Sequence, residues 1–438
     1  MSTPTRLATR ILWGLLIGVI AAIVTLGIGR FHPGTLRAMQ AVSTAVFDPL
    51  GQIFLRTLFF VVIPLVFASL ASGVAQLGRL DRLGPLAGRT FLLFAANMLV
   101  AVGIGLLMMN LLQPGHHLEP GSRERLMQEY GGRAHQAVER QHEQPGMSFA
   151  TLVDMFMPRN LFAAFVGNDR GMLGDVLPLI LFAILVGAAA TLLDEEKRLK
   201  VQAGLDLVSE LMTGIVGFAL RLAPIAVPAM IYSVIVKIGT DVLLTLAVFV
   251  VGCAVALALH LFGTMSLWLR LLARRSPLAY FRQIRPLLIT AFSTSSSSAS
   301  LPASLATARD DLALAPSTAG FVLPLGATMN MSGTALFEGC VVLFVAQAFG
   351  VDLSLGQQCM LMFLSVLSAV AVAGIPGGSM PLIAGLLATF GVPPDGIGLV
   401  LGVDRILDML RTTVNVGSDI VTATVVDAQV KAAARTGG

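Results

Sequence analysis

Charged residues are scarce in this 438-residue sequence. Asp, Glu, Lys and Arg together make up 12% of it, about half the share that is usual in soluble proteins. Apolar residues make up 55%, and the mean hydropathy is +0.83. This composition excludes an ordinary soluble protein and predicts an all-α polytopic membrane protein in contact with a lipid bilayer. The net charge of +4 does not indicate a nucleic-acid partner, because the basic residues gather in particular loops between apolar segments.

Cysteine is rare as well, and its placement excludes two further classes of protein. Cys253, Cys340 and Cys359 each lie in an apolar run, without a CxxC motif or a His nearby at ligand spacing. We therefore expect three core residues and neither a disulfide framework nor a metal site of that kind.

Six apolar segments have ordinary spanning length: residues 11–29, 47–75, 88–112, 173–193, 205–236 and 241–268. The first lacks a small-residue cleavage site, which favours a membrane span over a signal peptide. Basic residues mark alternate loops, including the one with Lys197, Arg198 and Lys200, and predict a cytoplasmic N-terminus in a cell (inner) membrane. Residues 114–146 are polar and lack periodicity, so we expect an irregular external loop there.

After Arg285, polar clusters interrupt the apolar segments. One cluster is STSSSSAS at 293–300, and the other is AGIPGGS at 373–379. Each is followed by a large apolar residue, a proline and an apolar segment with polar residues in its middle. The pattern predicts two copies of a re-entrant helical hairpin followed by a helix that is broken or polar at mid-membrane, as in transporters. The alternatives are a flexible serine linker and, at Asn330 to Thr334, a glycine-kinked core helix.

A charged stripe follows the second cluster. Its residues are spaced four, three, four and four apart and fall within about 80° of a helix surface: Asp404, Asp408, Arg411, Asn415 and Asp419. Each charge at membrane depth costs at least ~2.5 kcal/mol, so the stripe should face a cavity or the protein interior. Arg411 suits a carboxylate ligand, Asp408 an ammonium group and Asp419 a small hard cation. A structural ladder of ion pairs without a ligand is the alternative.

These motifs resemble the dicarboxylate/amino acid:cation symporter family, which includes the glutamate and aspartate transporters. SSSSASLP resembles the tip of its first hairpin and PLGATMNMSGTALFEG its broken seventh helix, while AGIPGGSMP resembles its second hairpin and VDRILDMLRTTVNVGSD its eighth helix. The resemblance implies eight transmembrane helices plus two re-entrant hairpins, an elevator mechanism and a homotrimer.

The resemblance also implies a division into domains. Residues 1–87 and 113–236 would form the scaffold together with an external loop, and residues 88–112 and 237–438 the transport domain. Within the latter, hairpin 1 would span about 278–315, the broken seventh helix about 318–348, hairpin 2 about 357–395 and the eighth helix about 397–426.

Site residues carried over from the family form two groups. The substrate would be bound by Asp408, Arg411, Thr412, Asn415, Thr334, Ser296, Ser297, Ile375, Gly378 and Ser379. Sodium ions would be bound by Asp419 and by oxygens of Gly326, Asn330 and Asn415, and at a second position by carbonyls of Thr328, Met331, Ala369, Val370 and Val372.

Departures from the family pattern concern the coupling ions. Ser332 stands where the family usually has Asp, and Phe94, Asn97 and Met98 stand where a third sodium site normally has Tyr, Thr and Ser. We therefore expect this site to be absent. Glu338 matches a protonatable Glu of proton-coupled members, so it is a candidate proton carrier; the alternative is a buried acid that is hydrogen-bonded to a neighbour and has no transport role. No cofactor other than sodium ions or protons is expected.

The pair of Asp408 and Arg411 favours aspartate or glutamate as substrate. The Asp404-Arg405 pair resembles members that carry C4-dicarboxylates, which leaves a dicarboxylate symporter as the alternative. An additional arginine of the family is missing at both Ser295 and Met409. An anion channel is the rival from another class. An enzyme is not expected, because the serines have no His or Lys base in the core spans.

Overall fold

The computed structural model describes residues 3–76, 84–130, 157, 159–161, 176–372 and 378–436, and every regular element in these ranges is helical. The α-helices are α1 (Thr3–Phe31), α2 (Pro33–Val42), α3 (Asp48–Phe60), α4 (Val62–Gln76), α5 (Gly84–Leu112), α6 (Pro120–Tyr130), α10 (Val176–Thr191), α11 (Glu195–Ile238), α12 (Asp241–Ala258), α13 (Met265–Leu271), α14 (Pro277–Gln283), α15 (Arg285–Thr294), α16 (Ser297–Ala306), α17 (Pro316–Met329), α18 (Ser332–Ala348), α19 (Leu355–Ala371), α20 (Met380–Thr389) and α21 (Gly398–Thr436).

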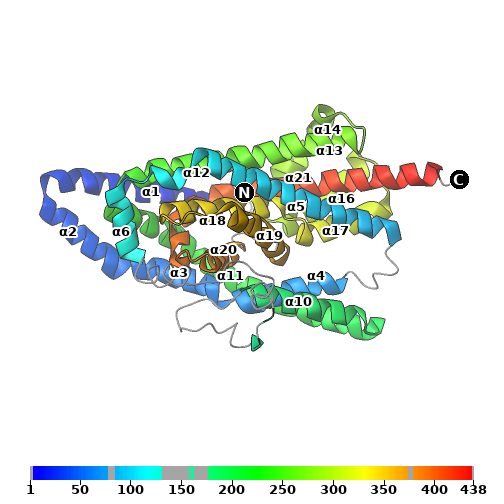
Figure 1. The fold of residues 1–438 in the computed structure, drawn as a ribbon, viewed down its shortest axis with the longest axis horizontal. Helices are drawn as coiled ribbons and strands as arrows, with labels where there is room; N and C mark the ends of the chain where they lie inside the picture. The colour runs from blue at the N-terminus through cyan, green and yellow to red at the C-terminus, as the bar shows by residue number, and fades with distance from the viewer. Residues whose placement is uncertain are drawn as a thin grey trace.

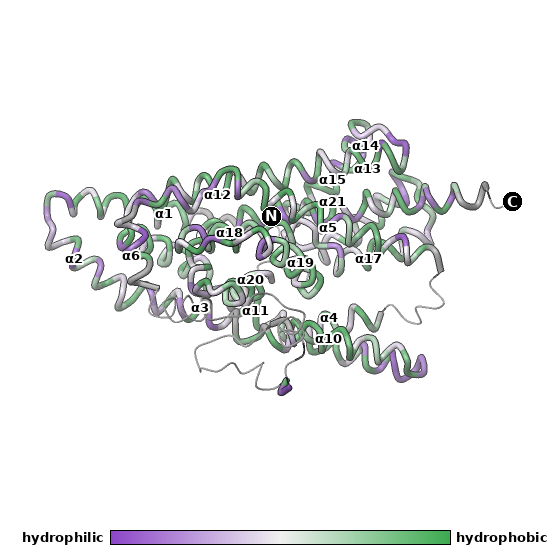
Figure 2. The backbone as a smooth tube through the Cα atoms, in the orientation of Figure 1, coloured by the Kyte–Doolittle hydropathy of each residue, from purple (hydrophilic) through white to green (hydrophobic). Residues whose placement is uncertain are grey.

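Several of these helices are long and apolar enough to cross a membrane. Among the described residues, six such segments are found: Trp13–Phe31, Leu86–His117, Glu195–Phe218, Arg221–Ile238, Asp241–Leu271 and Pro316–Ala348. Apolar residues dominate the long helices in Figure 2, and polar residues gather near helix ends such as those around α6 and α14. The prediction of a helical, multi-pass membrane protein is confirmed.

The helices pack in two sets. In the first, α11 contacts α1, α3 and α4, and α4 lies beside α10 at the lower edge of Figure 1. In the second, α21 contacts α5, α12, α15, α16, α17 and α18. All 17 residues of α18 are buried, so this helix is surrounded by protein on every side. The charged stripe of α21 is therefore on a helix that packs against this fully buried one.

Three helix boundaries differ from those expected. Segment 47–75 is divided at Val61 into α3 and α4. The predicted basic loop at 197–200 is the start of α11, where Lys197 pairs with Asp194 at 3.0 Å and Lys200 with Glu196 at 2.6 Å. Acidic residues at a helix N-terminus and pairs three or four residues apart both favour a helix here.

The predicted irregular loop at 114–146 is also partly wrong, because residues 120–130 form α6. Pro120 at its first position suits a helix start. The Ser122 hydroxyl donates a hydrogen bond to the Ile238 carbonyl at 3.0 Å and ties α6 to the end of α11. A local sequence pattern does not predict a hydrogen bond between residues so far apart in the chain. The remainder of that loop, residues 131–146, lies outside the described residues.

The prediction of three core cysteines fails at one position. Cys253 and Cys340 are buried, whereas Cys359 on α19 is exposed. The buried positions of α19 include Leu361, two residues further on. Two residues rotate a helix by about 200°, so Cys359 lies on the opposite face.

Two non-helical joints bring polar groups into the second set of helices. At the serine cluster, α15 ends at Thr294 and α16 begins at Ser297, with Ser295 in the left-handed conformation at φ 51°. The Ser296 side chain accepts a hydrogen bond from the Ala299 amide at 3.2 Å, which caps α16. The serine cluster is therefore a structured turn between two packed helices and not a flexible linker.

The second joint divides the helical segment at Asn330 and Met331, between α17 and α18. Their backbone angles, φ −113°, ψ 56° and φ −86°, ψ 61°, are outside the helical range. The predicted break is confirmed at this position, and the alternative of a kinked but continuous helix is wrong.

Candidate functional site

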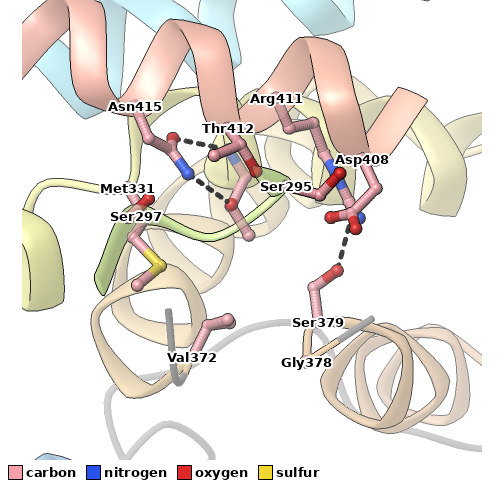
Figure 3. Close-up of a pocket in the computed structure, with 11 residues that line it drawn as sticks. Ser295, Ser297, Met331, Val372, Gly378, Ser379, Asp408, Arg411, Thr412 and Asn415 are labelled. Atoms are coloured by element: carbon pink, nitrogen blue, oxygen red, sulfur yellow. Dashed lines mark hydrogen bonds and ion pairs between the residues drawn. The ribbon is translucent and has the colours of Figure 1, made fainter. Parts of the chain in front are cut away.

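A cavity lies beside the middle of α21, and residues far apart in the chain line it. It encloses about 270 Å³ of empty space, open solvent at its mouth included. Figure 3 shows Asp408, Arg411, Thr412 and Asn415 projecting from one helix towards residues of the opposite wall. The described lining residues are Ser295, Ser297, Met331, Thr334, Val372, Gly378, Ser379, Asp408, Arg411, Thr412 and Asn415.

Three helix N-termini meet at this cavity. Ser297 is the first residue of α16, Ser379 immediately precedes α20, and Thr334 lies in the first turn of α18. A helix N-terminus carries about half a positive charge and free amide donors, so each favours an anionic ligand. The cavity therefore offers several positive dipole ends in addition to the guanidinium of Arg411.

Arg411 is the central charged group. Its residue is 2% exposed, and its guanidinium carbon lies 4.1 Å from the ring centre of Phe337. Nη1 donates to the Ser379 hydroxyl at 2.7 Å, and Nη2 donates to Asp408 Oδ1 at 2.7 Å and to Asp404 Oδ1 at 3.1 Å. These contacts hold the guanidinium over an aromatic ring at the wall of the cavity.

The stripe thus contains ion pairs and also borders a cavity, so the ladder alternative describes only part of it. Asp408 receives a second guanidinium from Arg405, with Arg405 Nη1 at 3.3 Å from Asp408 Oδ2. Asp404, which has no role in the expected site, is a counter-ion of Arg411.

Asn415 joins the stripe to the N-terminus of α18. Its Oδ1 accepts hydrogen bonds from the amides of Gly333 at 2.8 Å and Thr334 at 3.3 Å, while its Nδ2 donates to the Thr334 hydroxyl at 3.1 Å. A Cβ atom at Gly333 would lie 2.6 Å from the Arg411 carbonyl oxygen, so only glycine permits this close approach. The broken segment is thereby fixed against α21 at the level of the cavity.

A second cluster surrounds Asp419, two turns further along α21. Asp419 is 3% exposed, and its Oδ1 accepts a hydrogen bond from Asn330 Nδ2 at 2.8 Å. Gly326 adjoins it, since a Cβ there would lie 2.5 Å from the same oxygen. Among the described residues no Lys or Arg forms an ion pair with Asp419. A buried carboxylate beside the carbonyl end of α17 has the hard oxygen chemistry that a small cation prefers.

The residues expected at a second cation position lie where two chain segments end. Met331 and Val372 line the cavity, while Thr328 is in the last turn of α17 and donates its hydroxyl to the Leu325 carbonyl at 3.0 Å. Ala369 and Val370 occupy the last turn of α19, where the Ala369 carbonyl accepts a hydrogen bond from Val372 at 3.3 Å. Helix ends leave carbonyl oxygens available, so the placement is compatible with a cation.

The third cation site, which we expected to be absent, is replaced by uncharged side chains. Asn97 of α5 donates a hydrogen bond to Asn330 Oδ1 at 2.8 Å. Ser332 and Ser418 share a hydrogen bond of 3.0 Å. Phe94 and Met98, which lie on α5 close to Asn97 in the sequence, are also buried. The described residues therefore place amides, hydroxyls and apolar groups here in place of a second carboxylate.

Glu338 is fully buried on α18, with both carboxylate oxygens lacking a hydrogen-bond partner among the described residues. The Ser368 hydroxyl of α19 lies near it without reaching ordinary hydrogen-bond geometry. Both interpretations of Glu338, a proton carrier and a buried acid hydrogen-bonded to a neighbour, stay predictions.

Most of the expected substrate residues come together, with two exceptions. Ser296 caps α16 and does not line the cavity, and Ile375 lies outside the described residues. Sequence analysis missed Ser295, whose buried hydroxyl lacks a hydrogen-bond partner among the described residues and borders the cavity. Its place as the first of the four consecutive serines of the cluster was the available signal.

Comparison with known proteins identifies the family to which the chain belongs. The chain is 30% identical to the proton/sodium-glutamate symport protein of Bacillus caldotenax over 408 residues, covering 92% of this chain and 90% of that protein. It is 29% identical to the C4-dicarboxylate transport protein of Bacillus subtilis, covering 95% and 92%. It is 28% identical to the proton/glutamate-aspartate symporter of Escherichia coli, covering 94% and 90%. The profile of the sodium:dicarboxylate symporter family matches residues 7–429, so the chain belongs to that family.

Proposed function

We propose that the protein is a secondary active symporter that takes up an acidic amino acid, aspartate or glutamate, together with sodium ions, protons or both. One observation carries this proposal: Arg411 and Asp408 border a cavity at three helix N-termini, while the buried Asp419 lies two turns away on the same helix. Arg411 would bind the side-chain carboxylate and Asp408 the ammonium group, and Thr334, Thr412 and Asn415 would add polar contacts.

The main-chain carboxylate of the substrate would be held at the two turns facing α21. Ser295 and Ser297 offer hydroxyls and a helix N-terminus on one side, and Gly378 and Ser379 offer backbone groups, one hydroxyl and the N-terminus of α20 on the other. Ile375 belongs to the same proposed group by resemblance. Binding by helix N-termini suits a carboxylate because their free amides and positive dipole ends favour an anion.

The proposed mechanism is an elevator. α5 and the helices from α12 onwards would move as the transport domain against a scaffold of α1 to α4, α10 and α11, in a homotrimer with eight transmembrane helices and two re-entrant hairpins. The grouping of contacts around α11 in one set and around α21 in the other supports this division, and the two sets also touch each other, for example where α11 meets α21. We further propose an inner-membrane location with the N-terminus in the cytoplasm, because basic residues concentrate in alternate loops and such loops usually face the cytoplasm.

For coupling, we propose fewer sodium sites than in three-sodium members of the family. Asp419 with Gly326, Asn330 and Asn415 would bind one ion, and Thr328, Met331, Ala369, Val370 and Val372 a second. Glu338 would carry a proton, a role that its full burial favours, since no Lys or Arg among the described residues forms an ion pair with it. Glu338→Gln should then remove the response of uptake to an imposed proton gradient, with the response to sodium retained.

Uptake into proteoliposomes tests the whole proposal. Labelled aspartate, glutamate and succinate are offered separately under a sodium gradient, a proton gradient or neither. We expect accumulation of acidic amino acids that requires a gradient and counterflow that saturates. Equal uptake without any gradient would contradict symport, and ohmic anion current without exchange would favour a channel. Succinate transport with no amino-acid transport would favour the C4-dicarboxylate alternative.

A further inference from the structure

Asp408 lies between two arginines of its own helix. Arg405 precedes it by three residues and Arg411 follows it by three, so the two side chains leave α21 about 60° to either side of it. Arg405 Nη1 lies 3.3 Å from Asp408 Oδ2, and Arg411 Nη2 lies 2.7 Å from Asp408 Oδ1. Each carboxylate oxygen therefore has a guanidinium of its own.

The two arginines differ in their other contacts. Arg411 lines the cavity and also bonds to Ser379 and Asp404. Arg405 is not among the described lining residues, its side chain is 12% exposed, and its ion pair is with Asp408. Arg411 can thus turn towards a ligand and keep Asp404 as counter-ion, while Arg405 remains on the far side of Asp408.

We propose that Arg405 is a specificity-determining residue that serves as a built-in counter-ion of Asp408, so that the cavity accepts C4-dicarboxylates as well as acidic amino acids. This inference rests on the proposed function. A buried carboxylate left without a partner is strongly destabilising. The ammonium group of an amino acid supplies a partner to Asp408, whereas a dicarboxylate has no such group. Arg405 supplies that partner whichever substrate is bound.

Replacement of Arg405 by Gln tests the inference in proteoliposomes that are offered labelled aspartate and labelled succinate. We expect succinate uptake to fall by about tenfold or more relative to aspartate uptake, mainly through a higher KM, because Asp408 then lacks a partner when succinate binds. Arg405→Lys keeps the charge and should restore most of the ratio. Arg282→Gln, at an exposed residue of α14, is the matched control and should leave the ratio unchanged.

Loss of any positive charge near the cavity also weakens the binding of a dianion more than that of a monoanion. A double-mutant cycle is therefore needed to isolate the contribution of the ion pair between Arg405 and Asp408. In the Asp408→Asn protein the carboxylate that pairs with Arg405 is gone, so adding Arg405→Gln should leave the KM for succinate within about twofold. If the KM for succinate rises as far in this background as in the wild type, the effect comes only from the lost positive charge near the cavity, and the inference is wrong.

Other outcomes separate this inference from the proposed function. Transport of neither substrate by the wild-type protein would defeat the proposed function, whereas aspartate transport without any succinate transport would defeat only the role of Arg405. An unchanged ratio in folded Arg405→Gln would also overturn it. Should that variant fail to fold, Arg405→Met, which keeps the apolar part of the side chain without its charge, decides: a succinate-to-aspartate ratio lowered about tenfold supports the inference, and an unchanged ratio contradicts it.

Discussion

Two carboxylates on α21 are buried to a similar extent but are stabilised in different ways. Asp408 is 6% exposed and lies between the guanidinium groups of Arg405 and Arg411. Asp419 is 3% exposed and accepts a hydrogen bond from the neutral amide of Asn330. A neutral donor compensates a buried charge less well than a cation does. The comparison indicates that the region of Asp408 is balanced within the protein, whereas that of Asp419 favours an added cation.

Removal of Arg411 should have the largest effect on stability and uptake, because it unbalances the charges around Asp408. Arg411→Ala leaves Asp404 and Asp408 without a shared cation, which should lower the free energy of unfolding by about 3–5 kcal/mol and aspartate uptake by at least about 100-fold. Thermal unfolding and uptake measure the two losses. Arg411→Lys is the comparison variant: it should recover stability more than uptake, because an ammonium lacks the planar fork. Full uptake by Arg411→Ala would contradict the assignment.

Neutralisation of Asp419 should impair sodium binding and leave stability almost unchanged. Asp419→Asn removes the one carboxylate of the proposed sodium site, so uptake driven by a sodium gradient should fall about 100-fold with little loss of stability. Asp427→Asn offers a matched control on the same helix, because Asp427 pairs with Lys431 away from the cavity. Sodium-dependent uptake that survives intact in Asp419→Asn would show that the cation binds elsewhere.

The close approach of α17 to Asp419 can be tested with two glycines of one helix. In Gly326→Ala the new Cβ would lie 2.5 Å from Asp419 Oδ1 and must displace it, which should raise the sodium concentration for half-maximal uptake by about tenfold. In Gly320→Ala the new Cβ meets nothing within 4 Å, so helix propensity should raise stability by about 0.5–1 kcal/mol with no change in sodium dependence. Equal sodium dependence in both variants would contradict the proposed site.

The smallest effect is expected at the serine turn. Ser295→Ala removes a buried hydroxyl that has no described partner in the protein, so stability should be nearly unchanged. If that hydroxyl binds substrate, the KM for aspartate should rise by about threefold to tenfold, the usual value of one hydrogen bond. Ser293→Ala, which removes an exposed hydroxyl bonded to its own helix at Ile289, serves as the control. An unaltered KM in Ser295→Ala would remove this residue from the site.

Features confined to one stretch of chain were predictable from the sequence. The stripe of α21 could be recognised because charges are rare in apolar segments and helical spacing aligns them. The break at Asn330 was predictable because Asn330 and Gly333 both disfavour a helix at that point. Both predictions used only local residue types and intervals.

Contacts between distant segments could not be predicted in the same way. The hydrogen bond from Arg411 to Ser379 depends on how α20 approaches α21, and that from Asn97 to Asn330 on how α5 packs beside the broken segment. The exposed side of Cys359 likewise depends on which face of α19 the neighbouring helices cover. These outcomes follow from tertiary packing, which a single sequence does not encode as a local pattern.

The amide of Asn330 has a consequence for turnover. In the proposed cycle the transport domain must also return across the membrane without substrate and coupling ions. In that step an unpaired, buried carboxylate at Asp419 would be energetically unfavourable. Because Asn97 donates to Asn330 Oδ1, the other end of the same side chain is directed at Asp419 as a hydrogen-bond donor. An arriving cation would displace this donor, and a departing cation would be replaced by it. Asn330 would thus lower the barrier of the empty return and limit how tightly the cation is held.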